Sequence, residues 1–179
     1  MAGVSFSLDL GDGLSLALRT AATDPAVHRL IERNLDRLRP WEPWAQGEQT
    51  EAGTAAFTRL QLDQFSRGAV VPTVILHGDE PIGAASLKLD SYLGTAELGY
   101  WIDRDWEGRG IVTRACAALI EHAVGQGMKR IEIRTAAQNE RSRGVAERLG
   151  FEREGLLKQA LPIGDDRVDV VLYGRIVGT

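Results

Sequence analysis

Several kinds of residue are scarce in this sequence, and each shortage excludes a class of protein. Cys116 is the single cysteine, so the chain cannot form an internal disulfide. The three histidines are scattered and show none of the Cys/His spacings of a structural zinc site. The longest apolar stretches, such as residues 68–76 and 168–173, fall far short of the ~20 residues that a membrane-spanning helix needs. We therefore expect a cytoplasmic protein that holds no metal and has no membrane partner.

Neither sign of charge is in large excess. The 21 Lys and Arg residues face 25 Asp and Glu residues, so the formal net charge is −4 and no bulk attraction to nucleic acid is expected. Only three of the basic residues are lysine; arginine favours forked contacts to phosphate, but codon bias is the simpler explanation of the excess. An anionic ligand therefore needs a local positive site. Residues 1–18 lack the basic start of a signal peptide and carry Asp9 and Asp12.

Hydrophobic periodicity predicts an α+β fold in a single domain over residues 1–179. The pattern begins with a helical N-terminal third, continues as a meander of strands, and ends in strand-helix-strand-helix and a hairpin. Helices are predicted over residues 23–38, 50–66, 111–124 and 139–149, and strands over residues 69–76, 82–89, 96–102, 130–134, 155–160 and 168–176. The inner face predicted for the second helix consists of Ala55, Ala56, Phe57 and Leu60.

Glycine is abundant, with 20 residues against a usual share of ~7%, and two of them lie in the most informative segment. Gly108 and Gly110 lie in a turn that leads from a strand into a helix. Glycine lets a backbone approach a phosphate closely, and a helix start presents unpaired N–H groups at its positive end. The pattern predicts pyrophosphate binding, although a plain strand-to-helix turn fits it as well. It is not a P-loop, because no Gly-Lys-Ser/Thr follows, nor a dinucleotide fingerprint, because Thr113 replaces the third glycine.

Several short motifs, in order, resemble the GCN5-related N-acetyltransferase (GNAT) superfamily. They are Glu97-Leu98-Gly99-Tyr100-Trp101-Ile102, Glu107-Gly108-Arg109-Gly110-Ile111-Val112-Thr113, Asn139-Glu140-Arg141-Ser142 and Glu147-Arg148-Leu149-Gly150-Phe151. With Arg39-Pro40-Trp41-Glu42-Pro43-Trp44, the chain is most similar to the branch of RimJ/RimL-like ribosomal-protein N-terminal acetyltransferases, over residues 14–176. The resemblance implies a GNAT-like mixed, mostly antiparallel twisted sheet with helices on both faces. It also implies a splay between the strands from Ala96 to Ile102 and from Arg130 to Arg134, which admits the pantetheine arm of acetyl-CoA.

The resemblance implies acetyl-CoA as co-substrate and no metal. The cofactor-binding residues that it implies are Trp101, Ile102, Gly108, Arg109, Gly110, Ile111, Val112, Thr113 and Asn139. The family motif Gln/Arg-x-x-Gly-x-Gly/Ala has Glu107 at its first position here and Val112 at its last. We expect Glu107 to point to solvent, toward Arg104 or Arg109, so that backbone amides bind the phosphates.

The chemistry implied is attack of an amine on a thioester. A primary amine has a pKa of roughly 8 to 10 and needs a base at neutral pH. Glu97, on the strand before the loop, is the best-placed carboxylate, directly or through a water, although a charged residue on a solvated strand face explains it equally well. Ser142 is the candidate group near the thioester sulfur, where its hydroxyl stabilises the leaving thiolate. Asn139 contacts the pantetheine or only caps the helix.

Trp41 and Trp44 are the candidate acceptor-binding residues. Aromatic residues in a Pro-rich loop line a cleft or cover one end of the core. The expected acceptor is a primary amine, first the N-terminal α-amine of a ribosomal protein and next a small amine or antibiotic. A CoA-binding sensor without turnover is the non-enzymatic alternative. The sequence leaves open whether the chain forms a homodimer and which acyl group it prefers.

Overall fold

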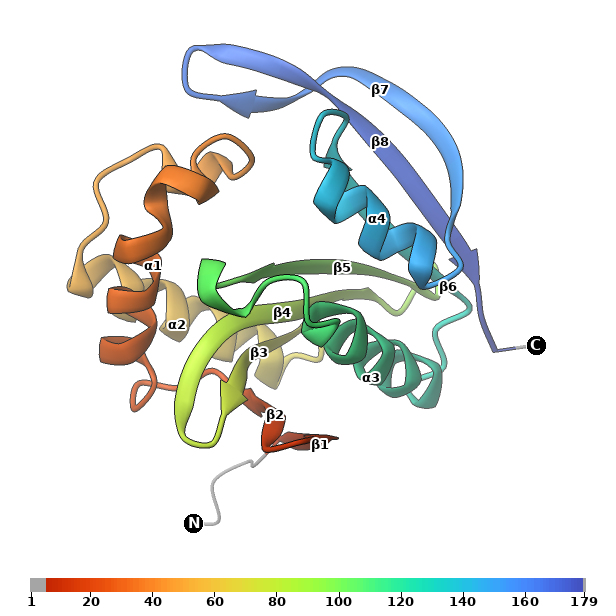
Figure 1. Cartoon of the computed structure of the whole chain (residues 1–179). Helices are drawn as coiled ribbons and strands as arrows, with labels where there is room; N and C mark the ends of the chain where they lie inside the picture. Colours follow the sequence, from red (N-terminus) through yellow and green to blue (C-terminus); the bar gives the residue numbers. More distant parts are fainter. Residues whose placement is uncertain (1–5, 179) are drawn as a thin grey trace.

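An eight-stranded sheet runs through the computed structural model, which describes residues 6–178 (Figure 1). The strands are β1 (Ser7–Gly11), β2 (Leu14–Leu18), β3 (Val70–His77), β4 (Glu80–Asp90), β5 (Thr95–Ile102), β6 (Arg130–Ala136), β7 (Glu152–Ile163) and β8 (Asp166–Ile176). Their spatial order is β1-β2-β3-β4-β5-β6-β8-β7, and only β5 and β6 pair in parallel. The predicted α+β fold with a mostly antiparallel sheet is therefore confirmed.

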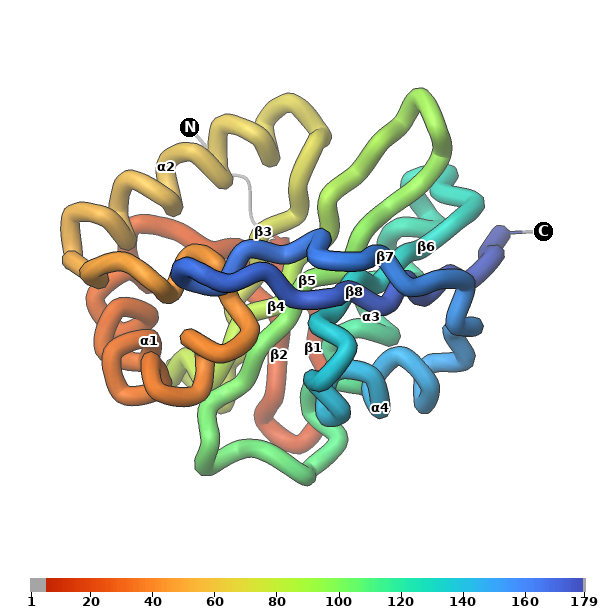
Figure 2. Tube along the Cα trace, turned by 90° about the horizontal axis from the view of Figure 1, so that it is seen from above, coloured from red at the N-terminus to blue at the C-terminus, as the bar shows by residue number. Residues whose placement is uncertain are grey.

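Helices lie on both faces of this sheet (Figures 1 and 2). They are α1 (Asp24–Leu38), α2 (Glu51–Ser66), α3 (Ile111–Gly125) and α4 (Glu140–Arg148), with single 3₁₀ turns η1 (Pro43–Ala45) and η2 (Arg104–Trp106). Side chains of successive strand residues point to opposite faces. On β5, Leu98 belongs to the core under α3, whereas Trp101 packs with residues of α1. The two helix layers therefore meet opposite faces of β5.

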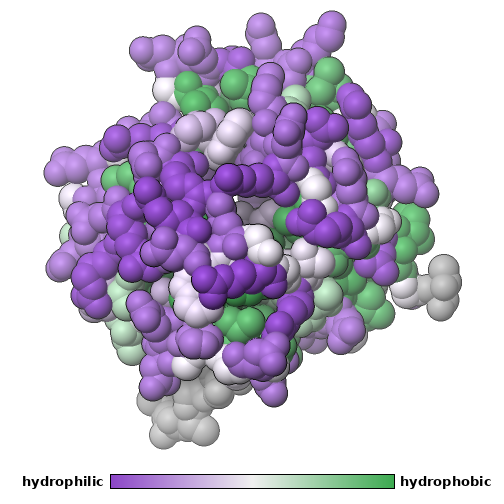
Figure 3. All heavy atoms as spheres, in the orientation of Figure 1, coloured by the Kyte–Doolittle hydropathy of each residue, from purple (hydrophilic) through white to green (hydrophobic). Residues whose placement is uncertain are grey.

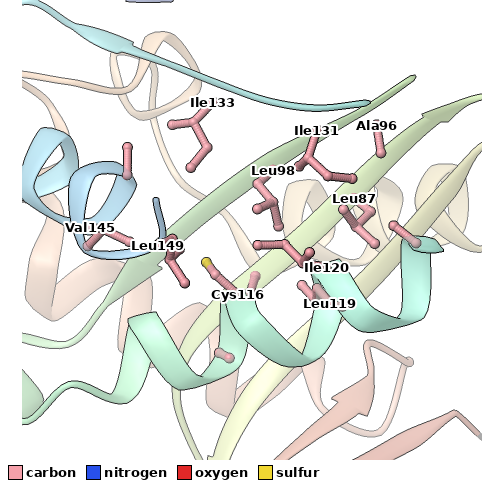
Figure 4. Packing of buried hydrophobic residues seen from close by; sticks show 14 of the residues in the cluster. Leu87, Ala96, Leu98, Cys116, Leu119, Ile120, Ile131, Ile133, Val145 and Leu149 are labelled. Carbon is pink, nitrogen blue, oxygen red and sulfur yellow. The ribbon is translucent and has the colours of Figure 1, made fainter. Parts of the chain in front are cut away.

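The larger core lies between the sheet and α3 with α4 (Figure 4). Apolar residues of α3 recur three or four positions apart and so share one face of the helix. The buried residues labelled in Figure 4 are Leu87, Ala96, Leu98, Cys116, Leu119, Ile120, Ile131, Ile133, Val145 and Leu149. Cys116 is fully buried, and burial raises the pKa of its thiol.

A buried polar network joins Arg19, the residue after β2, to α1 and α2. The Thr58 hydroxyl donates to Asp24 Oδ1 at 2.5 Å and accepts from Arg19 Nε at 2.7 Å. The predicted inner face of α2 is therefore wrong: Thr58 faces inward, while Phe57 and Leu60 are 49% and 52% exposed. A hydroxyl that satisfies a buried ion pair outweighs the burial of one apolar side chain here.

The prediction of a helical N-terminal third is also incomplete. β1 and β2 form a hairpin before α1, and β2 pairs with β3 as part of the sheet. The alternating pattern of β2 spans only five residues, in which Leu14, Leu16 and Leu18 are buried and the two residues between them are half-buried. Of the segment tested for a signal peptide, residues 1–5 lie outside the described part of the chain.

Candidate active site

β5 and β6 pair only over the first half of β5 and then separate, which opens the sheet. Their register pairs Thr95 with Arg130 and ends at Leu98 with Ile133. Beyond that point β6 continues beside β8, and the last four residues of β5 have no partner on that side among residues 6–178. The predicted splay is confirmed, and it leaves an edge of unpaired backbone N–H and C=O groups. The space-filling view shows a hollow near the centre of this face (Figure 3), which Figure 1 places between α1, α4, β5 and the β7–β8 hairpin.

The loop from η2 to α3 has the conformation of an anion-binding turn. Gly108 and Gly110 have φ values of 73° and 71°, a left-handed conformation that other residues adopt at a cost. The Arg114 amide is the first to reach a helical carbonyl, that of Gly110 at 3.1 Å, so the preceding amides are open at the positive end of α3. The Thr113 hydroxyl is buried and has no hydrogen-bond partner among residues 6–178. Open amides and an unsatisfied hydroxyl fit the pyrophosphate of a nucleotide cofactor.

Glu107, which departs from the family motif, lies elsewhere than predicted. It does not extend toward Arg104 or Arg109: its side chain is 27% exposed and pairs with Arg37 of α1 and with Arg141 of α4, at 2.5 Å for the latter. Two guanidinium groups therefore neutralise the carboxylate beside the loop. Arg109 instead stacks its guanidinium 4.8 Å from the ring centre of Trp106, and its Nη2 donates to the Asp105 carbonyl at 2.9 Å.

The loop is anchored to α1 by a buried contact. Asp103 is completely buried and accepts hydrogen bonds from Arg33 and from Asn34 Nδ2, the latter at 2.9 Å. The backbone amide of Arg104 donates to Asn34 Oδ1 at 3.1 Å. These contacts fix the end of β5 to a helix more than sixty residues earlier in the sequence, and hydrophobic periodicity does not reveal them.

The start of α4 faces β5 across the core side of the sheet. Asn139 is the N-cap, as predicted, and its side chain accepts the Ser142 amide at 3.2 Å. The Tyr100 hydroxyl donates to the Ser142 carbonyl at 3.0 Å and lies 3.1 Å from the Ser142 hydroxyl. Burial raises the pKa of Tyr100, so the phenol stays neutral. The structure thus brings Ser142 to the strand that precedes the loop, and Tyr100 is a neighbour that the sequence motifs did not single out.

Glu97 lies where β5 and β6 begin to separate. It is opposite Glu132 in the register and on the same face as Trp101, because the two residues are four positions apart on the strand. Its side chain is 37% exposed, and Oε2 lies 3.9 Å from Arg134 Nε. A half-exposed carboxylate with one long ion pair remains accessible to an amine or to water, but it also fits a solvated strand face.

The acceptor-side residues lie at the end of α1. The predicted Pro-rich loop contains one 3₁₀ turn, which begins at Pro43. The ring centres of Trp44 and Trp101 are 6.4 Å apart, and Trp44 is 43% exposed. Trp41 is half-buried. Glu42, not singled out from the sequence, accepts a hydrogen bond from Trp44 Nε1 at 2.8 Å. The loop therefore meets β5 at the open part of the sheet.

Several features are absent from the described residues. No helix within residues 6–178 is long and apolar enough to cross a membrane. In the same part of the chain, no three His, Cys, Asp or Glu side chains are grouped to hold a metal ion. Two surface pockets, between α1 and the β3–β4 turn and between α3 and the end of β8, lie away from the splay.

A splayed mixed sheet beside a loop of open backbone amides defines a class of proteins that bind a phosphate-bearing cofactor. Within that class, the chain belongs to the GNAT acetyltransferase family, because the family model described as "Acetyltransferase (GNAT) domain" matches residues 15–152. The predicted resemblance is confirmed.

Individual relatives agree with this assignment. The ribosomal-protein-serine acetyltransferase of Escherichia coli (strain K12) is 36% identical over 153 residues, which cover 84% of this chain and 86% of that protein. The putative ribosomal N-acetyltransferase YdaF of Bacillus subtilis (strain 168) is 31% identical over 175 residues, covering 96% and 95%. A solved structure of RimL, a ribosomal L7/L12 alpha-N-protein acetyltransferase in complex with coenzyme A, has a TM-score of 0.93 at 27% identity and covers 97% of this chain and 99% of that one. The chain is an N-acetyltransferase that uses acetyl-CoA as co-substrate.

Proposed function

We propose that this enzyme, one domain over residues 1–179, acetylates the N-terminal α-amine of a protein of the ribosomal type after which its relatives are named. The observation that carries the proposal is the position of the Trp44 and Trp101 rings, 6.4 Å apart beside the open edge of β5. Two aromatic rings next to a free strand edge suit the extended end of a peptide. The peptide backbone can hydrogen-bond the strand edge while its apolar side chains pack against the rings. An enzyme with this acceptor acts in the cytoplasm, where ribosomal proteins are made.

The proposed co-substrate site follows the path from the loop to the splay. Backbone amides from Gly108 to Thr113 bind the pyrophosphate at the positive end of α3, with the free Thr113 hydroxyl as a further donor. The loop positions proposed to contribute backbone are Gly108, Arg109, Gly110, Ile111, Val112 and Thr113. Trp101 and Ile102 offer their unpaired backbone edge to the pantetheine amides, and Asn139 lies on the opposite wall. Acetyl-CoA supplies a thioester carbonyl that an amine attacks.

The chain's own residues handle the protons in this proposal. Glu97 accepts a proton from the acceptor's ammonium, directly or through a water, and leaves a neutral amine. The amine nitrogen forms the new C–N bond, the C–S bond breaks, and the leaving thiolate takes up a proton equivalent to the one that nitrogen loses. Ser142 stabilises that thiolate through its hydroxyl, which Tyr100 holds at 3.1 Å. An aliphatic hydroxyl is a weak acid, so Ser142 orients and donates a hydrogen bond more than it protonates.

A direct assay tests the proposed function. Purified protein is mixed with acetyl-CoA and peptides with N-terminal serine or alanine, and thiol release is followed with mass spectrometry of the peptide. We expect amine-dependent thiol release and acetylation at the N-terminus alone. Matched peptides with a blocked N-terminus and a free internal lysine serve as controls, beside small amines including an aminated antibiotic. If the enzyme prefers a small amine to the peptides, its acceptor is a small molecule and not a protein N-terminus. If it binds CoA tightly but acetylates no amine, the chain is a CoA-binding sensor.

A further inference from the structure

Glu42 is a half-buried carboxylate without a cationic partner. The buried carboxylates Asp24 and Asp103 each pair with an arginine. Among residues 6–178, no ion pair involves Glu42, whose side chain accepts one hydrogen bond, from the Trp44 indole at 2.8 Å. In a chain with 18 arginines, a half-buried carboxylate without an ion pair directs attention to what faces it.

Burial and a single hydrogen bond govern the ionisation of Glu42. Burial raises the pKa of Glu42 to about 7, and the hydrogen bond from Trp44 offsets only part of that effect. Arg39, the residue after α1, makes no ion pair with Glu42 within residues 6–178, and its Nε donates to the Ala45 carbonyl at 3.2 Å. Withdrawing a carboxylate from water without a counter-ion is unfavourable. A cation that enters this part of the site is therefore stabilised.

Glu42 lies on the acceptor side of the splay. Its partner Trp44 faces Trp101, with ring centres 6.4 Å apart. Trp101 is four residues beyond Glu97 on β5, which is roughly 13 Å along an extended strand. The tip of the β7–β8 hairpin closes the same corner: a Cβ added at Gly164 would lie 3.6 Å from Gln46 Oε1. Figures 1 and 2 both show this hairpin passing over toward η1.

We propose that Glu42 and the Trp44 ring form a subsite for a positively charged side chain of the acceptor, a few residues after the reacting amine. This inference rests on the proposed function, in which Glu97 serves the reacting amine itself. The distance from Glu97 to Trp101 matches about four residues of extended peptide. The carboxylate provides an ion pair and the indole face a cation–π contact. The substrate class is thus a polypeptide with Lys or Arg within its first residues.

The experiment compares arginine with citrulline, its neutral isostere, in short peptides that begin with serine. Each peptide carries one of the two residues at position 3, 4 or 5, and neither side chain is an amine that the enzyme can acetylate. We measure kcat/KM and, by tryptophan fluorescence with CoA present, the peptide Kd. We expect arginine to be preferred by about fivefold to tenfold at one position, the range of a partly shielded ion pair.

Three variants decide whether Glu42 causes the preference. Glu42→Gln keeps an acceptor for the Trp44 indole but loses the charge, so the preference for arginine falls to about one. Glu42→Arg reverses it, favouring a peptide with glutamate at that position. Glu48→Gln, at an exposed position of the same segment, is the matched control and leaves the preference unchanged.

Several outcomes would overturn the subsite. Equal rates and Kd values for arginine and citrulline peptides in the wild type would do so. An equal loss for both peptides in Glu42→Gln would show that Glu42 acts on the reacting amine or on the loop. If no peptide is acetylated, the proposed function fails instead, and the Kd comparison still decides whether the subsite exists.

Discussion

Nη1 of Arg141 lies 2.5 Å from Oε2 of Glu107, so the first turn of α4 is tied to the loop that precedes α3. The other carboxylate oxygen of Glu107 accepts a hydrogen bond from Arg37 of α1. One carboxylate thus links three segments around the proposed phosphate site. Two cations beside one anion leave a net positive charge there, in a chain whose overall charge is −4.

Replacing Glu107 by glutamine should lower stability and tighten CoA binding. Both ion pairs are lost, so the free energy of unfolding should fall by about 1–3 kcal/mol. The Kd for CoA, measured by calorimetry, should tighten by about threefold, because the guanidinium charges of Arg37 and Arg141 are then uncompensated beside the loop. A Kd that weakens would instead mean that the two ion pairs hold the loop in its binding conformation.

Arg141→Gln is the matched control for that variant. Its side chain is 75% exposed, so stability should hardly change. One positive charge disappears beside the loop, and CoA binding should weaken by about threefold, more at low salt than at high salt. A calorimetric titration at two salt concentrations distinguishes this charge effect from a change in loop geometry.

Gly110→Ala tests the conformation of the loop. Nothing lies within 4 Å of an added Cβ, so any loss comes from the backbone, whose φ of 71° strains a residue with a side chain. We expect stability to fall by about 1 kcal/mol and CoA binding to weaken about tenfold as the amides shift. Gly125→Ala, at the other end of α3 and equally uncrowded, should bind CoA normally. Unchanged CoA binding in Gly110→Ala would remove the loop from the proposed site.

Variants of Ser142 and Tyr100 should differ in kcat. Ser142→Ala removes the hydroxyl proposed to stabilise the thiolate, and kcat should fall about tenfold while the Kd for CoA holds. Tyr100→Phe keeps the Ser142 hydroxyl but removes the phenol that lies 3.1 Å from it and helps to orient it. The kcat of this variant should therefore fall less than that of Ser142→Ala. Loss of CoA affinity in proportion to kcat would make the pair structural.

Sequence patterns anticipated the frame of the site because local periods and glycine turns encode it. The alternation from Ala96 to Ile102 and the glycines at 108 and 110 sufficed for β5 and its loop. The hairpin before α1 was missed because β1 and β2 are five residues each, too short for a clear period. For α2, Thr58 turned inward because Arg19 and Asp24 form a buried pair that needs its hydroxyl.

The features of the site that could not be predicted from the sequence are polar contacts between residues far apart in the chain. Glu107 reaches arginines 70 residues before it and 34 after it, and no local period reports such pairs. Tyr100 stood inside a recognised motif, yet only its distance to Ser142 singles it out. Glu42 lies between Trp41 and Trp44, the two candidate acceptor-binding residues. A carboxylate in a Pro-rich aromatic loop was the available signal.

Glu97→Gln tests the proposed base. At neutral pH kcat should fall by about 10²-fold to 10⁴-fold, and the loss should shrink as pH rises toward about 8, where an α-amine deprotonates by itself. The Kd for CoA should hardly change. Glu132→Gln, directly opposite on β6 and bonded to Arg130 at 2.8 Å, is the control and should affect stability rather than this pH profile. Equal losses of kcat and CoA affinity in Glu97→Gln would make Glu97 structural.

Glu42 should make stability depend on pH. Burial raises its pKa from 4.5 to about 7, so between these values the folded chain keeps a proton that the unfolded chain has released. Its contribution is therefore fully present below about pH 4.5 and is lost as pH rises through about 7. Glu42→Gln resembles the protonated form at every pH.

The variant should thus match the wild type near pH 4.5 and become the more stable of the two by pH 8. The difference should be on the order of 1–2 kcal/mol, because each pKa unit is worth about 1.4 kcal/mol and partial exposure weakens the effect. Urea unfolding of both proteins across this pH range measures it, with Glu48→Gln as the exposed control. A difference that does not grow with pH would mean that Glu42 is hydrated, and the case for its need of a cationic partner would fall with it.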